Sequence, residues 1–547
     1  MAEHADHGHG PQLTGWRRWA FTTNHQEIGL MYLWTAFFFF IVGGILAMIM
    51  RGELATPGTA GQCVQGYACA NFVSPQTFNE AFTMHGTVMV FLWIMPAFAG
   101  FGNYFVPLMI GAKDMAFPRI NALSYWLIPP AGVMLFLGTF LPGTTMPDAG
   151  WTGYVPLSLK SPGVGMDFWF LGLHMLGVAS TLGALNFIIT ILRMRKPGVT
   201  FNNMPLFVWA QLTTSFLLVF SLPVLAAAQV MAFADRSLAT NFYLAQSGGA
   251  LLWQHLFWFF AHPEVYVLIL PAMGMVSEVL PKFSGRPIFG YKAIAYSTLA
   301  IGFLGFTVWV HHMFVTGIPT AVRTIFMINT MIIGVPTGVK IFNWVATIWG
   351  GKIQLRTPML FAIAFVANFL IGGLDGIFLA SIPVDYALTD TYWVVSHIHY
   401  VLFGGAVLGI FAGLYYWFPR MTGRMYNERL GVIHWFITVV AFNVTFFVQH
   451  SLGLAGMPRR VADYIPAFAE WNLISSIGAI VLGLAQLIFF YNILHSMRHG
   501  RIVGSDDPWG GSIRPEWKHG IMPKPQPAHA AEAQPAPPVV DAKPEEV

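Results

Sequence analysis

The stretch from Ile28 to Met50, IGLMYLWTAFFFFIVGGILAMIM, contains no charged residue and decides the fold class. A run of this length can cross about 30 Å of hydrocarbon as an α-helix. About twelve such runs recur along the chain, near residues 28–50, 82–107, 122–144, 166–192, 205–232, 250–279, 290–313, 325–348, 357–380, 392–418, 432–453 and 471–494. The pattern predicts an all-α membrane protein, a bundle of about twelve transmembrane helices.

The composition excludes a soluble surface. Only 10% of the 547 residues are charged and 56% are hydrophobic, whereas soluble proteins contain about 25% charged and 45–50% apolar residues. The net charge of +4 reflects an uneven distribution of basic residues between the loops, so it indicates no nucleic-acid partner.

Basic residues mark alternate loops, and short cytoplasmic loops retain Lys and Arg. Both termini are therefore predicted to face the cytoplasm. The opposite side has few basic residues, and the adjacent pair Arg459 and Arg460 is the exception there. The basic residues on the predicted cytoplasmic side are Arg17, Arg18, Lys113, Arg119, Arg193, Arg195, Lys196, Lys282, Arg286, Lys292, Lys352, Arg356, Arg420, Arg424, Arg429, Arg498 and Arg501.

The chain divides by composition into three parts. Residues 1–22 are predicted to be a cytoplasmic segment with no cleavable hydrophobic region, residues 23–498 the transmembrane domain, and residues 499–547 a polar cytoplasmic tail. The end of this tail is rich in Ala, Pro and Glu and is predicted to be partly disordered. Cys63 and Cys69 lie in the first outer loop, where an oxidising compartment favours a disulfide over two free thiols.

Histidines gather in the predicted spans. A histidine in a span that neither binds a metal nor forms a hydrogen bond costs several kcal/mol, so such clusters indicate function. A single one is more often a hydrogen-bond partner between helices than a ligand, but six together favour metal binding. They are His85 in the second span, His262 in the sixth, His311 and His312 at the end of the seventh, and His397 and His399 in the tenth.

The angles between these histidines around their helices indicate which of them can share a metal site. At 100° per residue, His397 and His399 project about 200° apart, so they must serve two sites on either side of one helix. His311 and His312 are about 100° apart and can converge on one ion if His262 supplies a third ligand. A site of three imidazoles suits copper, and zinc remains the alternative.

Four motifs resemble a known family. HPEVY (His262 to Tyr266), VWVHHM (Val308 to Met313), PTGVKIFNW (Pro336 to Trp344) and DTYWVVSHIHY (Asp390 to Tyr400) occur in the order found in subunit I of haem-copper terminal oxidases. The resemblance extends from about Thr23 to Tyr464 and is greatest to the cytochrome c oxidase branch with a glutamate-gated proton path. It implies a catalytic subunit that reduces O2 to water and pumps protons.

The resemblance also implies the cofactors, namely two haems and one copper ion. Haem A is the expected type, although the sequence leaves the haem side chains open. His85 and His399 would be the axial ligands of the low-spin haem, and His397 would be the proximal ligand of the high-spin haem. The copper would be held by His262, His311 and His312.

Proton handling is implied by a second set of residues. Tyr266 lies four residues after His262, on the same helix face, and in the family these two side chains are covalently joined. Glu264 is a carboxylate within a span, which suits it to carry protons. By resemblance Lys340 and Thr337 belong to a second proton path. The path to Glu264 would begin at Asp114, which could otherwise be a plain loop acid, and pass Asn103, Asn121, Asn186 and Ser180.

Several charged residues resemble those near the haem propionates or at cation sites. Arg459 and Arg460 would neutralise the propionates through charge-assisted hydrogen bonds, and Asp385 resembles an acid close to them. Arg51 resembles the residue that binds the formyl group of the low-spin haem, although an Arg at the end of a span can simply reach toward the interface. Glu53 matches an outer Ca²⁺ or Na⁺ site of some members.

The chain departs from the family pattern at two places. The Mg²⁺ site of the family takes adjacent His and Asp ligands, whereas this chain has Thr389 before Asp390, which puts that site in doubt. In the fourth span, Leu176 and Ala179 replace hydroxyl residues that line the path to the glutamate. Ser180 and Thr181 are the hydroxyl residues that remain there.

The electron donor can be predicted from four further positions. Relatives that oxidise quinol carry Arg, Asp, His and Gln where this chain has Val42, Leu46, Thr77 and Glu80. We therefore expect cytochrome c as donor. The resemblance further implies a subunit II with a dinuclear copper centre, a subunit III, and a location in the bacterial inner (plasma) membrane.

Three other classes were compared with this interpretation. A quinol oxidase is disfavoured by the four positions above. A nitric oxide reductase lacks the tyrosine and lysine that stand here at Tyr266 and Lys340. A proton-coupled transporter could use Asp114, Glu264 and Lys340 as a relay, but it needs no pair of histidines facing two ways, and its purified form would be colourless.

Overall fold

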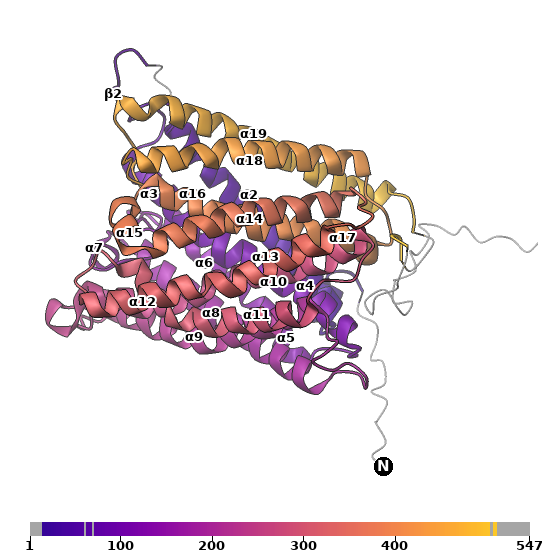
Figure 1. The fold of residues 1–547 in the computed structure, drawn as a ribbon. Helices are drawn as coiled ribbons and strands as arrows, with labels where there is room; N and C mark the ends of the chain where they lie inside the picture. Colours follow the sequence, from indigo (N-terminus) through magenta and orange to yellow (C-terminus); the bar gives the residue numbers. More distant parts are fainter. Residues whose placement is uncertain (1–13, 60–61, 68–70, 504–506, 511–547) are drawn as a thin grey trace, which may run out of the picture.

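The computed structural model describes residues 14–59, 62–67, 71–503 and 507–510. Long helices lie side by side with their ends gathered at two opposite faces (Figure 1). Eleven helical segments in this described part are long and apolar enough to cross a membrane, and the prediction of an all-α membrane protein is confirmed. The eleven are His25–Glu53, Pro75–Ile110, Pro118–Phe140, Gly165–Arg193, Leu206–Ser237, Gly249–Ser284, Thr320–Ile348, Thr357–Ala380, Tyr392–Thr422, Glu428–Leu454 and Pro466–His499.

Many of these segments consist of more than one element. The α-helices are α1 (Gly15–Phe21), α2 (His25–Glu53), α3 (Pro75–Thr87), α4 (Met95–Ile110), α5 (Pro118–Trp126), α6 (Ile128–Leu137), α7 (Leu157–Lys160), α8 (Gly165–Arg193), α9 (Leu206–Ser237), α10 (Gly249–Ser284), α11 (Tyr291–Leu304), α12 (Thr320–Ile332), α13 (Gly334–Ile348), α14 (Thr357–Ala380), α15 (Ile382–Leu388), α16 (Tyr392–Val401), α17 (Leu408–Thr422), α18 (Glu428–Leu454) and α19 (Ala469–His499). Short 3-10 helices are η2 (Gly138–Phe140), η3 (Ala245–Ser247), η4 (Gly305–Thr307), η5 (Trp309–Met313) and η7 (Pro466–Phe468), while η1 (Val88–Ile94) and η6 (Leu402–Val407) are π-helices.

The seventh predicted span, residues 290–313, does not form one α-helix. Its first part is α11, and the rest continues as the 3-10 helices η4 and η5. Helix α11 has 14 residues, too few to cross a bilayer as a single α-helix. Because the apolar run is unbroken in sequence, hydropathy alone does not reveal this change of helix type.

The described sheet is limited to the first loop. Strands β1 (Gly58–Thr59) and β2 (Gln62–Cys63) pair antiparallel. Cys69, the partner predicted for Cys63, lies outside the described residues, so the disulfide stays a prediction.

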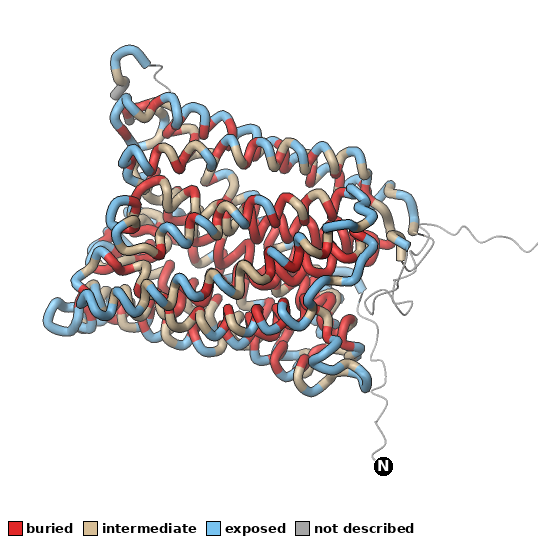
Figure 2. The backbone as a smooth tube through the Cα atoms, in the orientation of Figure 1, coloured by how far each residue is buried: buried red, intermediate tan, exposed pale blue. Residues whose placement is uncertain are grey.

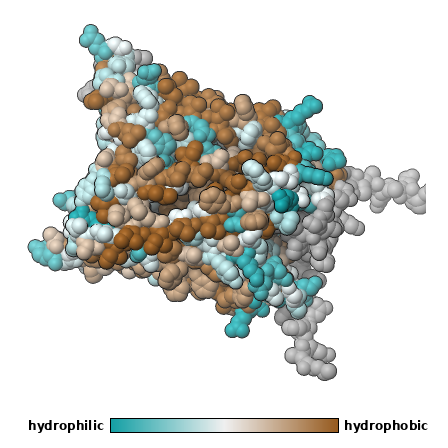
Figure 3. All heavy atoms as spheres, in the orientation of Figure 1, coloured by the Kyte–Doolittle hydropathy of each residue, from teal (hydrophilic) through white to brown (hydrophobic). Residues whose placement is uncertain are grey.

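Helix α2 shows how the bundle separates lipid from core. Trp34, Phe38, Ile41 and Ile45 follow helical spacing along one face and are exposed. The opposite face of the helix is buried against its neighbours. Similar apolar side chains cover the middle of the molecule, with polar residues toward both ends (Figure 3). This belt matches the hydrocarbon layer of a membrane.

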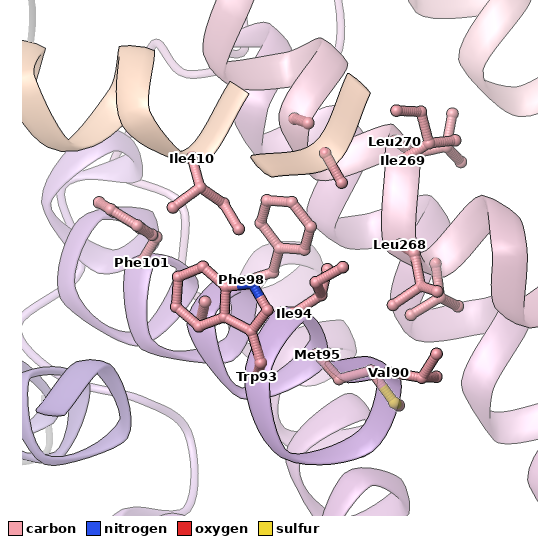
Figure 4. Close-up of a cluster of buried hydrophobic side chains, with 14 of the residues drawn as sticks. Val90, Trp93, Ile94, Met95, Phe98, Phe101, Leu268, Ile269, Leu270 and Ile410 are labelled. Atoms are coloured by element: carbon pink, nitrogen blue, oxygen red, sulfur yellow. The ribbon is translucent and has the colours of Figure 1, made fainter. Parts of the chain in front are cut away.

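Helices pack closely where small residues meet, as is common in membranes. A Cβ added to Gly29 of α2 would lie 2.8 Å from the carbonyl oxygen of Gly100 in α4. Further inside, Trp93 of η1, Leu268 of α10 and Ile410 of α17 belong to one apolar cluster (Figure 4). The innermost helices are buried along most of their length (Figure 2), so their polar residues face protein rather than lipid.

Both π-helices directly follow predicted haem ligands. The segment η1 begins three residues after His85, and η6 begins three residues after His399. Single π-turns inside α-helices are frequent at functional sites, because the extra residue redirects the side chains beside it.

The beginning of the predicted tail packs against the bundle. Helix α19 ends at His499, and Ile502 forms a β-bridge with Arg424. Asp507 pairs with Lys282 at 2.5 Å. Residues 504–506 and 511–547 of that tail, and residues 1–13, lie outside the described residues, so the domain limits and the side on which the termini lie stay predictions.

Candidate active site

Three predicted copper ligands converge. The Nδ1 atom of His262 lies 3.2 Å from Nε2 of His312, and Nε2 of His311 lies 3.0 Å from the same atom. Their ligand atoms all lie within 4.8 Å of one another, and this is the only group of three potential metal ligands found in the described part of the chain. Three imidazole nitrogens this close together suit one metal ion.

A threonine that the sequence interpretation missed orients one of these ligands. The hydroxyl of Thr330 in α12 donates to the carbonyl of Phe326. Its oxygen is therefore left to accept a hydrogen bond from Nδ1 of His311, 3.0 Å away. This leaves Nε2 of His311 free for a metal. A hydrogen bond to the second nitrogen is the usual way to fix the tautomer of a ligating histidine.

The local helix type also contributes. His311 and His312 lie in the 3-10 helix η5 rather than in an α-helix, so they project about 120° apart instead of 100°. Trp258 of α10 stacks on the ring of His312, with centroids 3.7 Å apart and planes at 10°. That contact restrains the ring from one side.

Tyr266 lies against His262 as predicted. Their ring centroids are 4.8 Å apart. The Nε2 atom of His262, which does not face the other two histidines, is buried with no hydrogen-bond partner among the described residues. It is therefore available to the tyrosine ring.

His85 and His399 face each other from two helices. Their rings are nearly parallel, at 13°, with centroids 6.4 Å apart. Nδ1 of His85 contacts the carbonyl of Gly43 at 2.8 Å, and Nδ1 of His399 contacts that of Val395 at 2.8 Å. Neither Nε2 atom is used in these contacts, and the separation accommodates one ion with metal–nitrogen distances of roughly 2 Å. The residues present thus fit a bis-imidazole haem.

His397 lies on the other side of α16, as its spacing from His399 predicted. Its Nδ1 contacts the carbonyl of Gly372 at 2.9 Å, which leaves Nε2 free. A Cβ added to Gly376 would lie 3.2 Å from Cε1 of His397. Helix α14 therefore supplies both the acceptor and the packing surface that orient this ring.

A buried contact between a carboxylate and an imidazole behind α16 was not anticipated. Asp375 of α14 and His450 of α18 are 2.9 Å apart, and Ser396 of α16 contacts the histidine at 3.0 Å. An Asp in an apolar span and a His in another were visible in the sequence, but nothing in their spacing pairs them.

The two predicted proton carriers are both deeply buried. Glu264 is 1% exposed, and neither carboxylate oxygen has a hydrogen-bond partner among the described residues. Lys340 is 1% exposed and donates to Thr298 of α11 at 2.6 Å. Thr337 lies one turn before Lys340 and donates to the carbonyl of Ile333. Thr298 is a further member of this group that the sequence interpretation missed.

The predicted entry to the glutamate path has several amide groups. Both side-chain polar atoms of Asn121 and the Oδ1 atom of Asn103 are buried without a partner among the described residues. Asn186 instead binds the backbone of Phe117. Burial raises the pKa of Asp114 in the loop between α4 and α5, although the N–H of Met115 partly offsets this. Buried amide groups without protein partners suit bound water.

Two loops meet at the predicted outer end. The N–H of Arg459 donates to the carbonyl of Asp390, and the two side chains form an ion pair at 2.8 Å. The Nε atom of Arg460 is buried without a partner among the described residues, and burial lowers the pKa of this side chain to about 10. Burial and the charge of Asp390 raise the pKa of Asp385 to about 7. An unsatisfied buried guanidinium fits an anionic group of a cofactor.

Arg51 and Glu53, which were also predicted to be functional at this end, have well-defined surroundings. Arg51 is buried and donates to the carbonyl of Asn472 and to Ser476, while its Nε atom has no partner among the described residues. Glu53 is fully buried. One of its oxygens accepts from two backbone N–H groups, of Phe72 and Val73, and the other has no partner among the residues that the structure describes.

These features define a helical membrane protein with a cluster of three potential metal ligands between its helices. A sequence profile described as "Cytochrome C and Quinol oxidase polypeptide I" matches residues 27–481. Cytochrome c oxidase subunit 1 of Thermostichus vulcanus is 51% identical over 505 residues, covering 92% of this chain and 89% of the relative. Cytochrome c oxidase subunit 1 of a Synechocystis species is 48% identical over 512 residues, covering 93% and 90%.

A solved heme-copper terminal oxidase dimer has the same fold. Its TM-score to this chain is 0.73 at 17% identity, with 91% of this chain and 88% of that chain covered. The chain therefore belongs to the cytochrome c and quinol oxidase polypeptide I family, the catalytic subunit I of haem-copper oxidases. The predicted family and the predicted enzyme class, an oxidoreductase of the cytochrome c oxidase type in the respiratory chain, are confirmed.

Proposed function

We propose that this subunit reduces O2 to water with electrons from cytochrome c and couples the reaction to proton pumping. The observation that carries the proposal is the convergence of His262, His311 and His312 beside Tyr266. A transporter has no use for three imidazole nitrogens in mutual contact. A tyrosine packed against one of them suits a reaction that needs a proton and an electron close to the metal.

The cofactors would supply electron storage and an O2-binding position, which are the haem and copper chemistry of the family. The chain's own part is to hold and orient them. His85 and His399 present two free Nε2 atoms to a low-spin haem, and His397 presents one to a high-spin haem. Haem A remains the expected type.

Tyr266 and His262 are proposed to be covalently joined. The bond would form between Nε2 of His262 and a ring carbon of Tyr266, replacing one N–H and one C–H bond, and the two electrons and two protons released would pass to O2, the oxidant of the proposed reaction. It would hold the phenol beside the copper ligands, where its proton and electron are available for O–O cleavage.

Glu264 and Lys340 are proposed to deliver protons from the cytoplasmic side. The carboxyl of Glu264 has no hydrogen-bond partner among the described residues. It could therefore turn between a water chain on the cytoplasmic side and the proposed metal site. Asp114, Asn103, Asn121, Asn186 and Ser180 would form the path to it. Lys340 with Thr337 would form the second path.

At the outer end, Arg459, Arg460 and Asp385 are proposed to surround the haem propionates, and Arg51 to bind the formyl group of the low-spin haem. Arg51 and Arg460 each have a buried side-chain nitrogen without a partner among the described residues, which supports these roles. Glu53 is a candidate Ca²⁺ or Na⁺ ligand through its free oxygen. Asp390 is a candidate Mg²⁺ ligand, although its carboxylate is paired with Arg459.

The electron donor proposed for this subunit determines which partner subunit must deliver its electrons. Val42, Leu46, Thr77 and Glu80 stand where quinol-oxidising relatives carry Arg, Asp, His and Gln, which favours cytochrome c. Its electrons would enter through a subunit II with a dinuclear copper centre, and a subunit III is also expected. We propose the bacterial inner membrane as the location of this multi-pass protein.

The test is the substitution E264Q. It should stop turnover or pumping while both haems still assemble, because an amide has the shape of the carboxyl but cannot carry its proton. Glu278 of the same helix offers a matched control. Its carboxylate accepts a hydrogen bond from the N–H of Leu206 and so holds the start of α9 against α10. The variant E278Q should keep turnover, and normal pumping in E264Q would refute the role of Glu264.

A further inference from the structure

A cavity of about 60 Å³ lies between α4, α8, α9 and α10. One water needs roughly 10–15 Å³ measured in this way, so there is room for several. Asn103 lines the cavity on α4, and Val267 lines it on α10, three residues after Glu264. Residues three apart lie on one side of a helix, so the cavity is adjacent to the unpartnered glutamate.

The α8 wall of this cavity is largely apolar. Leu176 and Ala179 line it and are buried, at 4% and 1% exposure. Ser180 is the hydroxyl residue that lines it on this helix. Water in a buried cavity requires two to four polar partners, and this wall offers few.

The α9 wall is polar. Gln211, Thr214 and Ser215 all line the cavity and are at most 5% exposed. The hydroxyl of Thr214 is buried with no hydrogen-bond partner among the described residues. Ser215 donates to the carbonyl of Gln211 at 2.7 Å, so its oxygen can still accept.

We propose that Thr214 and Ser215 of α9 hold the water chain that carries protons through this cavity to Glu264. This inference rests on the proton-carrying role proposed for Glu264. The α9 hydroxyls take the place of the hydroxyls that the α8 wall lacks at Leu176 and Ala179. A hydroxyl both donates and accepts, so it can pass the hydrogen-bond direction from one water to the next, whereas Leu and Ala can do neither.

The test is T214V, which removes the hydroxyl and keeps the branched shape. Proton uptake by the purified holoenzyme after mixing with O2 should slow by about fivefold, the factor expected for the loss of one hydrogen bond. The rate of electron transfer from the low-spin haem provides an internal control. The variant S215A should have a smaller effect in the same direction.

Thr213 provides the matched control. It is the neighbouring threonine on the same helix, donates to the carbonyl of Trp209, and contacts Gly302 rather than the cavity. The variant T213V should take up protons normally. Conversely, adding A179S to T214V should restore much of the rate, because it places a hydroxyl on the opposite wall.

The outcomes separate this inference from the proposed function. Normal uptake in both T214V and S215A, together with loss of uptake in E264Q, would overturn the role of α9 alone. Normal uptake in E264Q would instead remove the role of the glutamate. Absence of any rescue by A179S would show that Thr214 acts through packing.

Discussion

The orientation of His311 by Thr330 allows a quantitative test of the proposed copper site. The variant T330V keeps the shape of the side chain but removes the oxygen that accepts from Nδ1 of His311 at 3.0 Å. The histidine then has a buried N–H without an acceptor, which costs about 1–3 kcal/mol. Its alternative tautomer, with the proton on Nε2, cannot bind the metal through Nε2, the atom that faces the other histidines.

The expected consequence is weaker copper binding. Loss of such an outer partner typically lowers metal affinity roughly 10- to 100-fold, which corresponds to about 1.4–2.7 kcal/mol. The hydrogen-bond estimate gives the same range. The assay is the ratio of copper to iron in purified protein after equilibration with graded concentrations of a chelator, with the haem spectrum as a check of assembly.

Thr324 supplies the control for this experiment. It lies on the same helix, α12, and donates to the carbonyl of Thr320 without contacting a ligand. The variant T324V should keep its copper at every chelator concentration. If T330V retains as much copper as T324V at each chelator concentration, the hydrogen bond does not orient His311 and the reasoning is wrong.

Three further outcomes follow from the same structure. K340M should lower O2 consumption on the order of 10²-fold. Met fills the space of Lys340 but cannot donate a proton, as the ammonium does to the hydroxyl of Thr298. A normal rate of O2 consumption would exclude the second proton path. H399L should abolish the low-spin haem spectrum while metal analysis still finds copper. Since burial and Asp390 raise the pKa of Asp385 to about 7, its carboxyl should be protonated at pH 6 and ionised at pH 8. The infrared carbonyl band should therefore fade as pH rises and be missing in D385N; a band that does not change with pH would contradict this.

Much of the fold could be predicted because lipid imposes a strong constraint on sequence. An uncharged run such as 28–50 has few alternatives to a spanning helix. The same signal could not distinguish α11 from the 3-10 helices that follow it, because hydropathy is blind to the hydrogen-bond pattern. The change matters, since η5 sets the angle between His311 and His312.

Candidate ligands could also be predicted from the sequence, but not the groups that orient them. Histidines in spans are rare and costly, so His262 and His397 are conspicuous in the sequence. The carbonyls of Gly43 and Gly372 that orient two of the rings are backbone atoms, and every residue has one. Thr330 was hidden for a related reason, since an isolated threonine in a helix usually bonds its own backbone.

The pair of Asp375 and His450 shows why such a group needs the three-dimensional structure. Nε2 of His450 faces the carboxylate, and Nδ1 faces the carbonyl of Phe447 at 3.1 Å. Removing either partner would leave the other polar group buried without its hydrogen-bond partner, which costs about 1–3 kcal/mol. The pair joins α14 and α18 behind α16, where Ser396 contacts it beside His397. The pair should therefore support the position of α16, the helix that carries His397 and His399, which are predicted to ligate the two haems.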